Sequence, residues 1–102
     1  MIHFKAGVSL ENVKPQTAVG MKLAEQVYME SGIEVMVVTS VNDGRHMTGS
    51  KHYTGEAFDT RIWGISTERL QMMLVRLNTL MDHLGFDIVL ESDHFHIEYD
   101  PK

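Results

Sequence analysis

The sequence predicts an α+β fold in which a small antiparallel sheet with a C-terminal hairpin is backed by two main helices. Three observations lead to this fold class. Two segments carry apolar residues at helical spacing, β-branched or alternating runs lie between and after them, and the last two of these runs are separated by two residues. The 102 residues contain no internal repeat and no glycine- and serine-rich linker, so we expect one domain, residues 1–102.

The first half of the chain predicts one helix and one strand. Residues 1–14 have no regular pattern and are expected to form a short extended or irregular lead-in. Pro15 suits the first helical position because its missing N–H has no partner to lose there, and Gly32 is a natural stop, so we expect a helix over about 16–31. Residues 33–40 are β-branched and almost continuously apolar, which indicates a central strand.

The second half begins with a long polar segment. Residues 41–54 contain glycine but no hydrophobic period, so they predict a loop, and a loop of this length in a small domain is usually functional. Residues 57–62 alternate loosely and predict a strand. Ser66 or Thr67 can cap a second helix, which Gly85 ends. The apolar residues of that helix recur three and four positions apart: Leu70, Met73, Leu74, Leu77, Met81 and Leu84.

The chain closes with a predicted hairpin. Residues 86–91 and 94–99 are strand-like, and the two residues between them match the usual length of a hairpin turn. In that register Glu91 and His94 lie opposite each other. They share one side of the sheet with His96, because alternate residues of a strand point the same way.

Composition and charge exclude several classes of protein. Nine Lys and Arg stand against fourteen Asp and Glu, a net charge of −5 without a basic stripe, which argues against nucleic acid and anionic membrane surfaces as partners. The absence of cysteine excludes disulfides, thiolate metal sites and a cysteine nucleophile. The start of the chain lacks the apolar region of a signal peptide, and no apolar run could span a bilayer, so we expect synthesis in a cytoplasm and no membrane insertion.

Six histidines, four of them in two short polar segments, are the feature that points to chemistry. In the first segment His52 precedes Asp59 by seven residues, and Gly55 between them lets the chain turn sharply enough for both side chains to meet. Imidazole nitrogen and carboxylate oxygen are both good zinc ligands. Such a pair taken alone also fits a solvated polar loop.

The second segment, near the C-terminus, offers further ligands. His94, His96 and Glu98 share one side of their strand. One of the two histidines would complete a zinc site of two histidines and one aspartate, with a position left open for water, and a nearby carboxylate would serve as the base. The alternative is an exposed polar strand face with ordinary charge pairs.

Together the two segments match the pattern of a known family. The identities that carry it are Ser50, His52, Gly55, Ala57, Asp59, Glu91, Asp93, His94 and His96. This pattern resembles the D-Ala-D-Ala carboxypeptidase and hedgehog group of zinc metallopeptidases, over a stretch from about Val35 to the C-terminus. The close of the chain looks most like the small stand-alone phage and prophage members.

The resemblance implies a role for each matching position. His52, Asp59 and His96 would hold Zn²⁺. The catalytic carboxylate would be Glu91 by comparison with hedgehog-like members and Asp93 by comparison with others. We favour Glu91, because the hairpin puts Asp93 in the turn.

More than one role is open for His94, Arg45 and His46. A second interpretation makes His94 the zinc ligand, with Glu91 three residues before it. Otherwise a neutral His94 could donate a hydrogen bond to the oxyanion. Arg45 and His46 match loop positions where the family carries substrate- or oxyanion-binding side chains, and both also fit a solvated loop.

The function implied by the resemblance is zinc-dependent hydrolysis of a bond in the stem peptide of peptidoglycan. The chain would be a D-Ala-D-Ala carboxypeptidase or an L-Ala-D-Glu-type endopeptidase, and would act on the cell wall after release or as part of a phage programme. Two alternatives are a catalytically silent, zinc-stabilised binding module of hedgehog type and a metal-free interaction domain.

Overall fold

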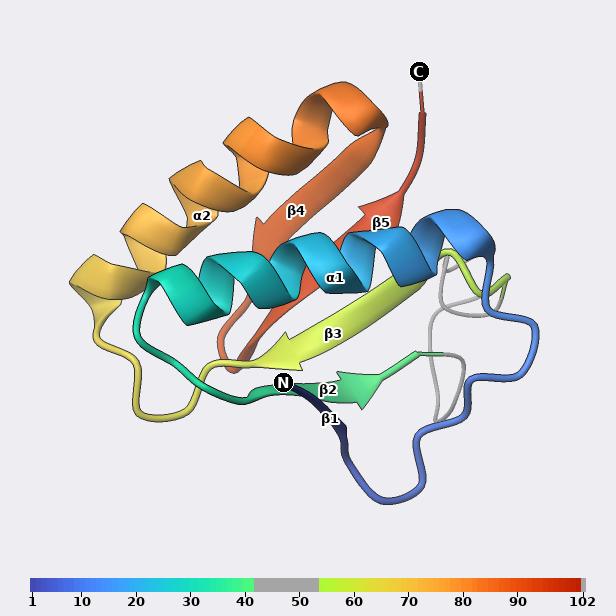
Figure 1. Ribbon diagram of the computed structural model, residues 1–102, viewed down its shortest axis with the longest axis horizontal. Coiled ribbons are helices and arrows are strands. Elements are labelled where there is room, and N and C mark those ends of the chain that lie inside the picture. Colours follow the sequence, from blue (N-terminus) through green and yellow to red (C-terminus); the bar gives the residue numbers. More distant parts are fainter. Residues whose placement is uncertain (42–53, 102) are drawn as a thin grey trace.

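The computed structural model describes residues 1–41 and 54–101, in which one five-stranded sheet carries two helices (Figure 1). The strands are β1 (Ile2–Phe4), β2 (Met36–Ser40), β3 (Ala57–Arg61), β4 (Phe86–Leu90) and β5 (His94–Tyr99). The helices are α1 (Pro15–Glu30) and α2 (Thr67–Met81), and a short 3₁₀ helix, η1 (Asp82–Leu84), follows α2. The α+β class and the C-terminal hairpin, β4–β5, are both confirmed.

The strand order of the sheet is β1-β2-β3-β5-β4. Its neighbouring pairs are antiparallel except β1 and β2, which run parallel with Ile2 opposite Met36. The extended β1 agrees with the predicted short extended or irregular lead-in over residues 1–14, but its parallel pairing differs from the predicted antiparallel sheet. Parallel neighbours must be joined by a crossover connection, here the one that contains α1. No pattern within a single segment of the sequence therefore indicates that β1 pairs with β2.

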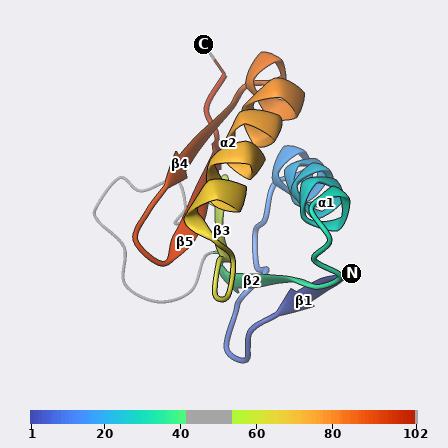
Figure 2. The same cartoon turned by 90° about the vertical axis from the view of Figure 1, so that its left-hand side faces the viewer.

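Both helices lie on one side of the sheet, as Figure 2 shows. Side chains on the covered side form the hydrophobic core and alternate along each strand with those of the other side. Phe58 and Thr60 of β3 are buried under the helices, as are Phe95 and Ile97 of β5. Asp59, which lies between two of these core residues, therefore faces away from the helices.

Helix α1 has Pro15 in its first position, as expected for this proline, and both of its ends lie one residue before the predicted range 16–31. Gly32 has a φ of 84°, and the backbone N–H of Ile33 donates to the carbonyl oxygen of Tyr28 at 2.9 Å. This turn at the end of the helix includes Ile33, which the sequence predicts to be the first residue of the strand. The strand β2 consequently begins at Met36 rather than at residue 33.

The buried side of α1 is anchored to β3 by a polar contact. The Tyr28 hydroxyl lies 2.8 Å from Oγ1 of Thr60 and donates to the carbonyl oxygen of Arg61 at 2.9 Å. Burial raises the pKa of Tyr28 to about 12, so the phenol stays protonated at neutral pH. Helix α1 thereby fixes the strand that carries Asp59.

Helix α2 is capped by Ser66, whose hydroxyl accepts a hydrogen bond from the backbone N–H of Arg69 at 3.2 Å. Its apolar stripe is buried at Leu70, Met73, Leu77 and Met81. The sequence also predicts Leu84 in this stripe, but that side chain is 44% exposed, because the chain tightens into η1 and turns it outward. Gly85 ends the helical segment as predicted, with a φ of 96°.

Candidate metal centre

The candidate centre lies on the side of the sheet away from the helices, where β3 pairs with β5. Asp59 stands directly opposite His96 in this ladder. Oδ1 of Asp59 lies 3.0 Å from Nδ1 of His96, and the two side chains are only 13% and 19% exposed. Two of the three zinc ligands implied by the resemblance are therefore in direct contact.

His96 is held from its other side by a residue to which the sequence assigns no role. Glu98, two positions further along β5, has Oε1 at 2.8 Å from Nε2 of His96. In metal sites, a carboxylate on the far nitrogen of a ligating histidine fixes the orientation and tautomer of the ring. Strand alternation predicts Glu98 on this side of the sheet, but only the folded distance identifies its partner.

The imidazole of His96 consequently lies between two carboxylates. The hydrogen bond with Asp59 raises the pKa of His96 most strongly, burial opposes this, and the hydrogen bond with Glu98 adds to the increase. Together they raise the pKa from 6.5 to about 9. The site therefore favours positive charge at neutral pH, and the same carboxylates would favour a divalent cation.

His94 occupies the next position on the same side of β5. Its Nδ1 lies 2.6 Å from Oδ1 of Asp93, and its Nε2 lies 3.7 Å from Oδ2 of Asp59. Each carboxylate oxygen of Asp59 thus has a histidine nitrogen nearby. The two interpretations of the histidine ligand, His96 or His94, are both compatible with this arrangement.

Glu91 flanks the hairpin turn as the sequence predicts. Its backbone N–H donates to the carbonyl oxygen of His94 at 2.8 Å, which extends the ladder one pair beyond Leu90 and Phe95. This register puts Glu91 and His94 on the same side of the hairpin. Asp93 lies in the turn with a side chain that is 73% exposed and bonded to His94.

The glycine between the two halves of the first motif is required by the backbone. Gly55 has a φ of 73°, and a Cβ added to it would collide with the carbonyl oxygen of Asn12. The Thr17 hydroxyl donates to the carbonyl oxygen of Gly55 at 2.8 Å. The sharp turn predicted at Gly55 is confirmed, and it starts β3 in the orientation that presents Asp59.

Three predicted site residues belong to the segment before this turn. His52, Arg45 and His46 lie outside the described residues. Their assignments, the first as a zinc ligand and the other two as substrate- or oxyanion-binding groups, stay predictions.

The donors that the structure brings together fit zinc by their chemistry. Asp59 offers carboxylate oxygen and His96 offers imidazole nitrogen, both of which Zn²⁺ accepts. The two groups are partly shielded from solvent, and Glu98 supplies the outer hydrogen bond that ligating histidines commonly have. A third donor is needed, and the motif assigns it to His52.

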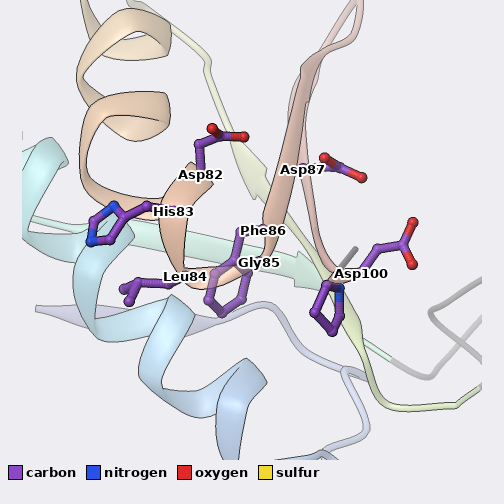
Figure 3. A pocket seen from close by; sticks show the side chains of 8 residues that line it. Asp82, His83, Leu84, Gly85, Phe86, Asp87 and Asp100 are labelled. Carbon is purple, nitrogen blue, oxygen red and sulfur yellow. The ribbon is translucent and has the colours of Figure 1, made fainter.

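A second acidic group, which shares Glu98 with the candidate centre, lies at the other end of the hairpin. Among the described residues, Asp87, Glu98 and Asp100 form the one set of three candidate ligand atoms within 4.8 Å of one another. Figure 3 shows Asp87 and Asp100 together on one side of the pocket around η1, with His83 on the other. Oxygen donors alone suit hard cations rather than zinc. Because exposed acidic groups are common without an ion, we assign no metal site to them.

Comparisons with protein-family models, with curated proteins and with solved structures give no match for this chain. Within the described ranges, neither helix is both long and apolar enough to cross a membrane. Function is therefore inferred from the motif residues and from the contacts that they make.

Proposed function

We propose that this chain is a zinc-dependent peptidase that hydrolyses a bond in the stem peptide of peptidoglycan. It would act as a D-Ala-D-Ala carboxypeptidase or as an L-Ala-D-Glu-type endopeptidase. The observation that carries the proposal is the shielded contact between Asp59 and His96, two motif residues far apart in the sequence. The outer hydrogen bond to Glu98 supports the same assignment.

In this proposal His52, Asp59 and His96 hold Zn²⁺, which when bound supplies Lewis-acid activation of water and of the scissile carbonyl. Glu91 accepts a proton from the attacking water and returns it to the leaving amine. His94 would donate a hydrogen bond from Nε2 to the developing oxyanion with a proton on both ring nitrogens, because its Nδ1 already faces Oδ1 of Asp93 at 2.6 Å.

Arg45 and His46 are proposed to bind the substrate or the oxyanion from the loop. The chain is proposed to be made in a bacterial cytoplasm. It would reach its cell-wall substrate after release or as part of a phage programme.

The direct test is incubation of the zinc-loaded protein with defined peptidoglycan fragments, with the products read by mass spectrometry. Release of D-alanine identifies the carboxypeptidase, and a split between L-alanine and D-glutamate identifies the endopeptidase. A protein that binds one zinc but cleaves no fragment is the hedgehog-type binding module instead. A protein that binds no zinc contradicts the proposal outright.

Replacing the proposed base tests the assignment of roles. We expect Glu91→Gln to keep its zinc and to lower kcat by about 10²–10⁴, because the variant keeps the shape of the side chain but cannot accept the proton. Asp93→Asn is the matched control, since it changes the other candidate carboxylate in the same way. Zinc content by elemental analysis separates loss of chemistry from loss of metal. The base is Asp93 if only Asp93→Asn loses turnover.

A further inference from the structure

A pocket of about 270 Å³ opens beside the candidate metal centre. Its lining includes Lys5, Asp59, Arg61, Trp63, Asp93 and His94. Arg61 follows Asp59 by two residues on β3 and stands opposite His94 on β5. The pocket and the centre therefore lie side by side on the same side of the sheet and share walls.

The acidic side chains of this pocket are already engaged, whereas its two cations are not. Each of the two aspartates contacts a histidine of the candidate centre. Over the described part of the chain, Lys5 and Arg61 both line the pocket without an ion-pair partner. The positive charges of Lys5 and Arg61 are therefore available to bind a negatively charged ligand.

The guanidinium of Arg61 is held in position by a stacking contact, although it has no ion-pair partner in the described part of the chain. Its Cζ lies 3.8 Å from the ring centroid of Trp63, a stacked cation–π contact. Its Nε is buried and has no hydrogen-bond partner among the described residues. Stacking fixes the guanidinium plane and leaves its terminal nitrogens available for two parallel hydrogen bonds.

The chemistry of these side chains suits a carboxylate. A planar guanidinium edge matches the two oxygens of a carboxylate, and Lys5 adds a second positive charge. Because the pocket shares Asp59 and His94 with the candidate centre, a carboxylate held by Arg61 would lie beside a peptide bond bound at that centre.

We propose that Lys5, Arg61 and Trp63 form the binding site for the C-terminal carboxylate of the substrate. The proposal rests on the proposed function for the position of the scissile bond, and it narrows that function. A peptide that ends one residue beyond the scissile bond fits this pocket, so the activity is that of a carboxypeptidase rather than an endopeptidase. Arg61 is then the residue that determines this specificity.

The first test measures binding without metal or turnover. Zinc-free, isotope-labelled protein is titrated with N-acetyl-D-alanine and with its C-terminal amide, and the Trp63 indole and Arg61 Nε–H signals are followed by NMR. We expect saturable shifts with the acid and binding weaker by roughly tenfold or more with the amide, because the amide cannot accept two charge-assisted hydrogen bonds.

Variants assign the binding to the pocket. Arg61→Gln should weaken binding of the acid by roughly tenfold or more, and Arg61→Lys should restore part of it. Arg69→Gln is the matched control, since it removes the same charge from an exposed position on α2. Lys5→Gln changes an exposed side chain, so it tests the pocket even if the Arg61 variants do not fold. Equal binding of acid and amide overturns the proposal, as does unchanged binding of the acid by folded Arg61→Gln and Lys5→Gln.

A second test uses turnover and separates this proposal from the proposed function. In the zinc-loaded protein, Arg61→Gln should raise KM for a peptide with a free C-terminus and so reduce the preference for that peptide over its amide. If the wild type cleaves the amidated peptide as well as the acid, the carboxylate site is wrong while the peptidase stands. If nothing is cleaved but the NMR titration succeeds, the peptidase is wrong while the carboxylate site stands.

Discussion

At the scale of single residues, His96 is the most constrained side chain of the candidate centre. Its two ring nitrogens face Asp59 and Glu98 at 3.0 and 2.8 Å, so the ring cannot rotate without breaking a contact. Such a ring is prepared for a metal before the metal arrives, because its orientation does not have to be selected on binding.

The variant Glu98→Gln tests whether Glu98 orients the ring of His96 for zinc binding. The variant keeps the size of the side chain but weakens the outer hydrogen bond, so we expect zinc affinity to fall by roughly 10–100-fold. Affinity is measured by competition with a chromophoric chelator, with the exposed Glu11→Gln as the control for lost negative charge. Zinc affinity equal to that of the wild type would show that Glu98 does not orient the ligand.

The raised pKa of His96 predicts how stability depends on pH in the zinc-free protein. The pKa is about 9 in the folded protein and near 6.5 when the chain is unfolded, so the folded state binds the proton more tightly. The resulting stabilisation is complete below pH 6.5 and is lost as the pH rises toward 9, at roughly 1.4 kcal/mol for each unit of pKa shift.

Urea unfolding in the presence of a chelator checks this pH dependence. The stability difference between wild type and His96→Gln should shrink steadily as the pH rises through that window. A difference that stays constant across the window would mean that His96 does not carry the charge.

At the scale of elements, α1 approaches β4 closely at one point. Gly20 faces Phe86 so closely that an added Cβ would lie 2.6 Å from Cε1 of the ring. Apolar residues at helical spacing predict one buried face of α1, but the reason for a glycine in that face comes from a strand more than sixty residues later.

The variant Gly20→Ala tests how much the stability of the protein depends on this close contact between α1 and β4. Alanine favours helix, yet the overlap with Phe86 would push the two elements apart, and we expect a net loss of about 1–3 kcal/mol in the free energy of unfolding. Gln16→Ala, at an exposed position of the same helix, should change stability by no more than about 0.5 kcal/mol. Denaturant unfolding compares the two, and a stabilised Gly20→Ala would show that the ring moves aside freely.

At the scale of the whole molecule, the candidate ligands are spread over the fold. Asp59 and His96 are on different strands, and α1 anchors the first of these strands through Tyr28. Since the proposed ligands converge only in the folded chain, binding free energy adds to folding free energy.

Zinc should therefore raise the Tm of the entire domain. At a free zinc concentration about 100 times Kd, linkage adds about 2.7 kcal/mol, which corresponds to a rise of roughly 10–20 °C for a domain of this size. Calorimetry with and without zinc at one pH measures the rise, and a chelator should reverse it. His96→Ala should show no response, and a similar rise in that variant would place the metal elsewhere.

Much of the fold could be predicted from the sequence because it depends on neighbours along the chain. Pro15 and Gly32 bound a helix through their own backbone preferences, and Ser66 caps one through a hydrogen bond three residues away. The end of α2 was harder to predict, since an apolar residue at 84 keeps the helical spacing although the backbone has already tightened into η1.

The same distinction divides the candidate site. The sequence by itself determined the hairpin register, and with it the shared side of Glu91, His94 and His96, because a two-residue turn and strand alternation are local properties. Only the tertiary structure decided that Asp59 meets His96 at 3.0 Å and that Arg61 shares a pocket with Lys5. These contacts join residues that are distant along the chain, and they depend on strand order, which no periodicity of a single segment encodes.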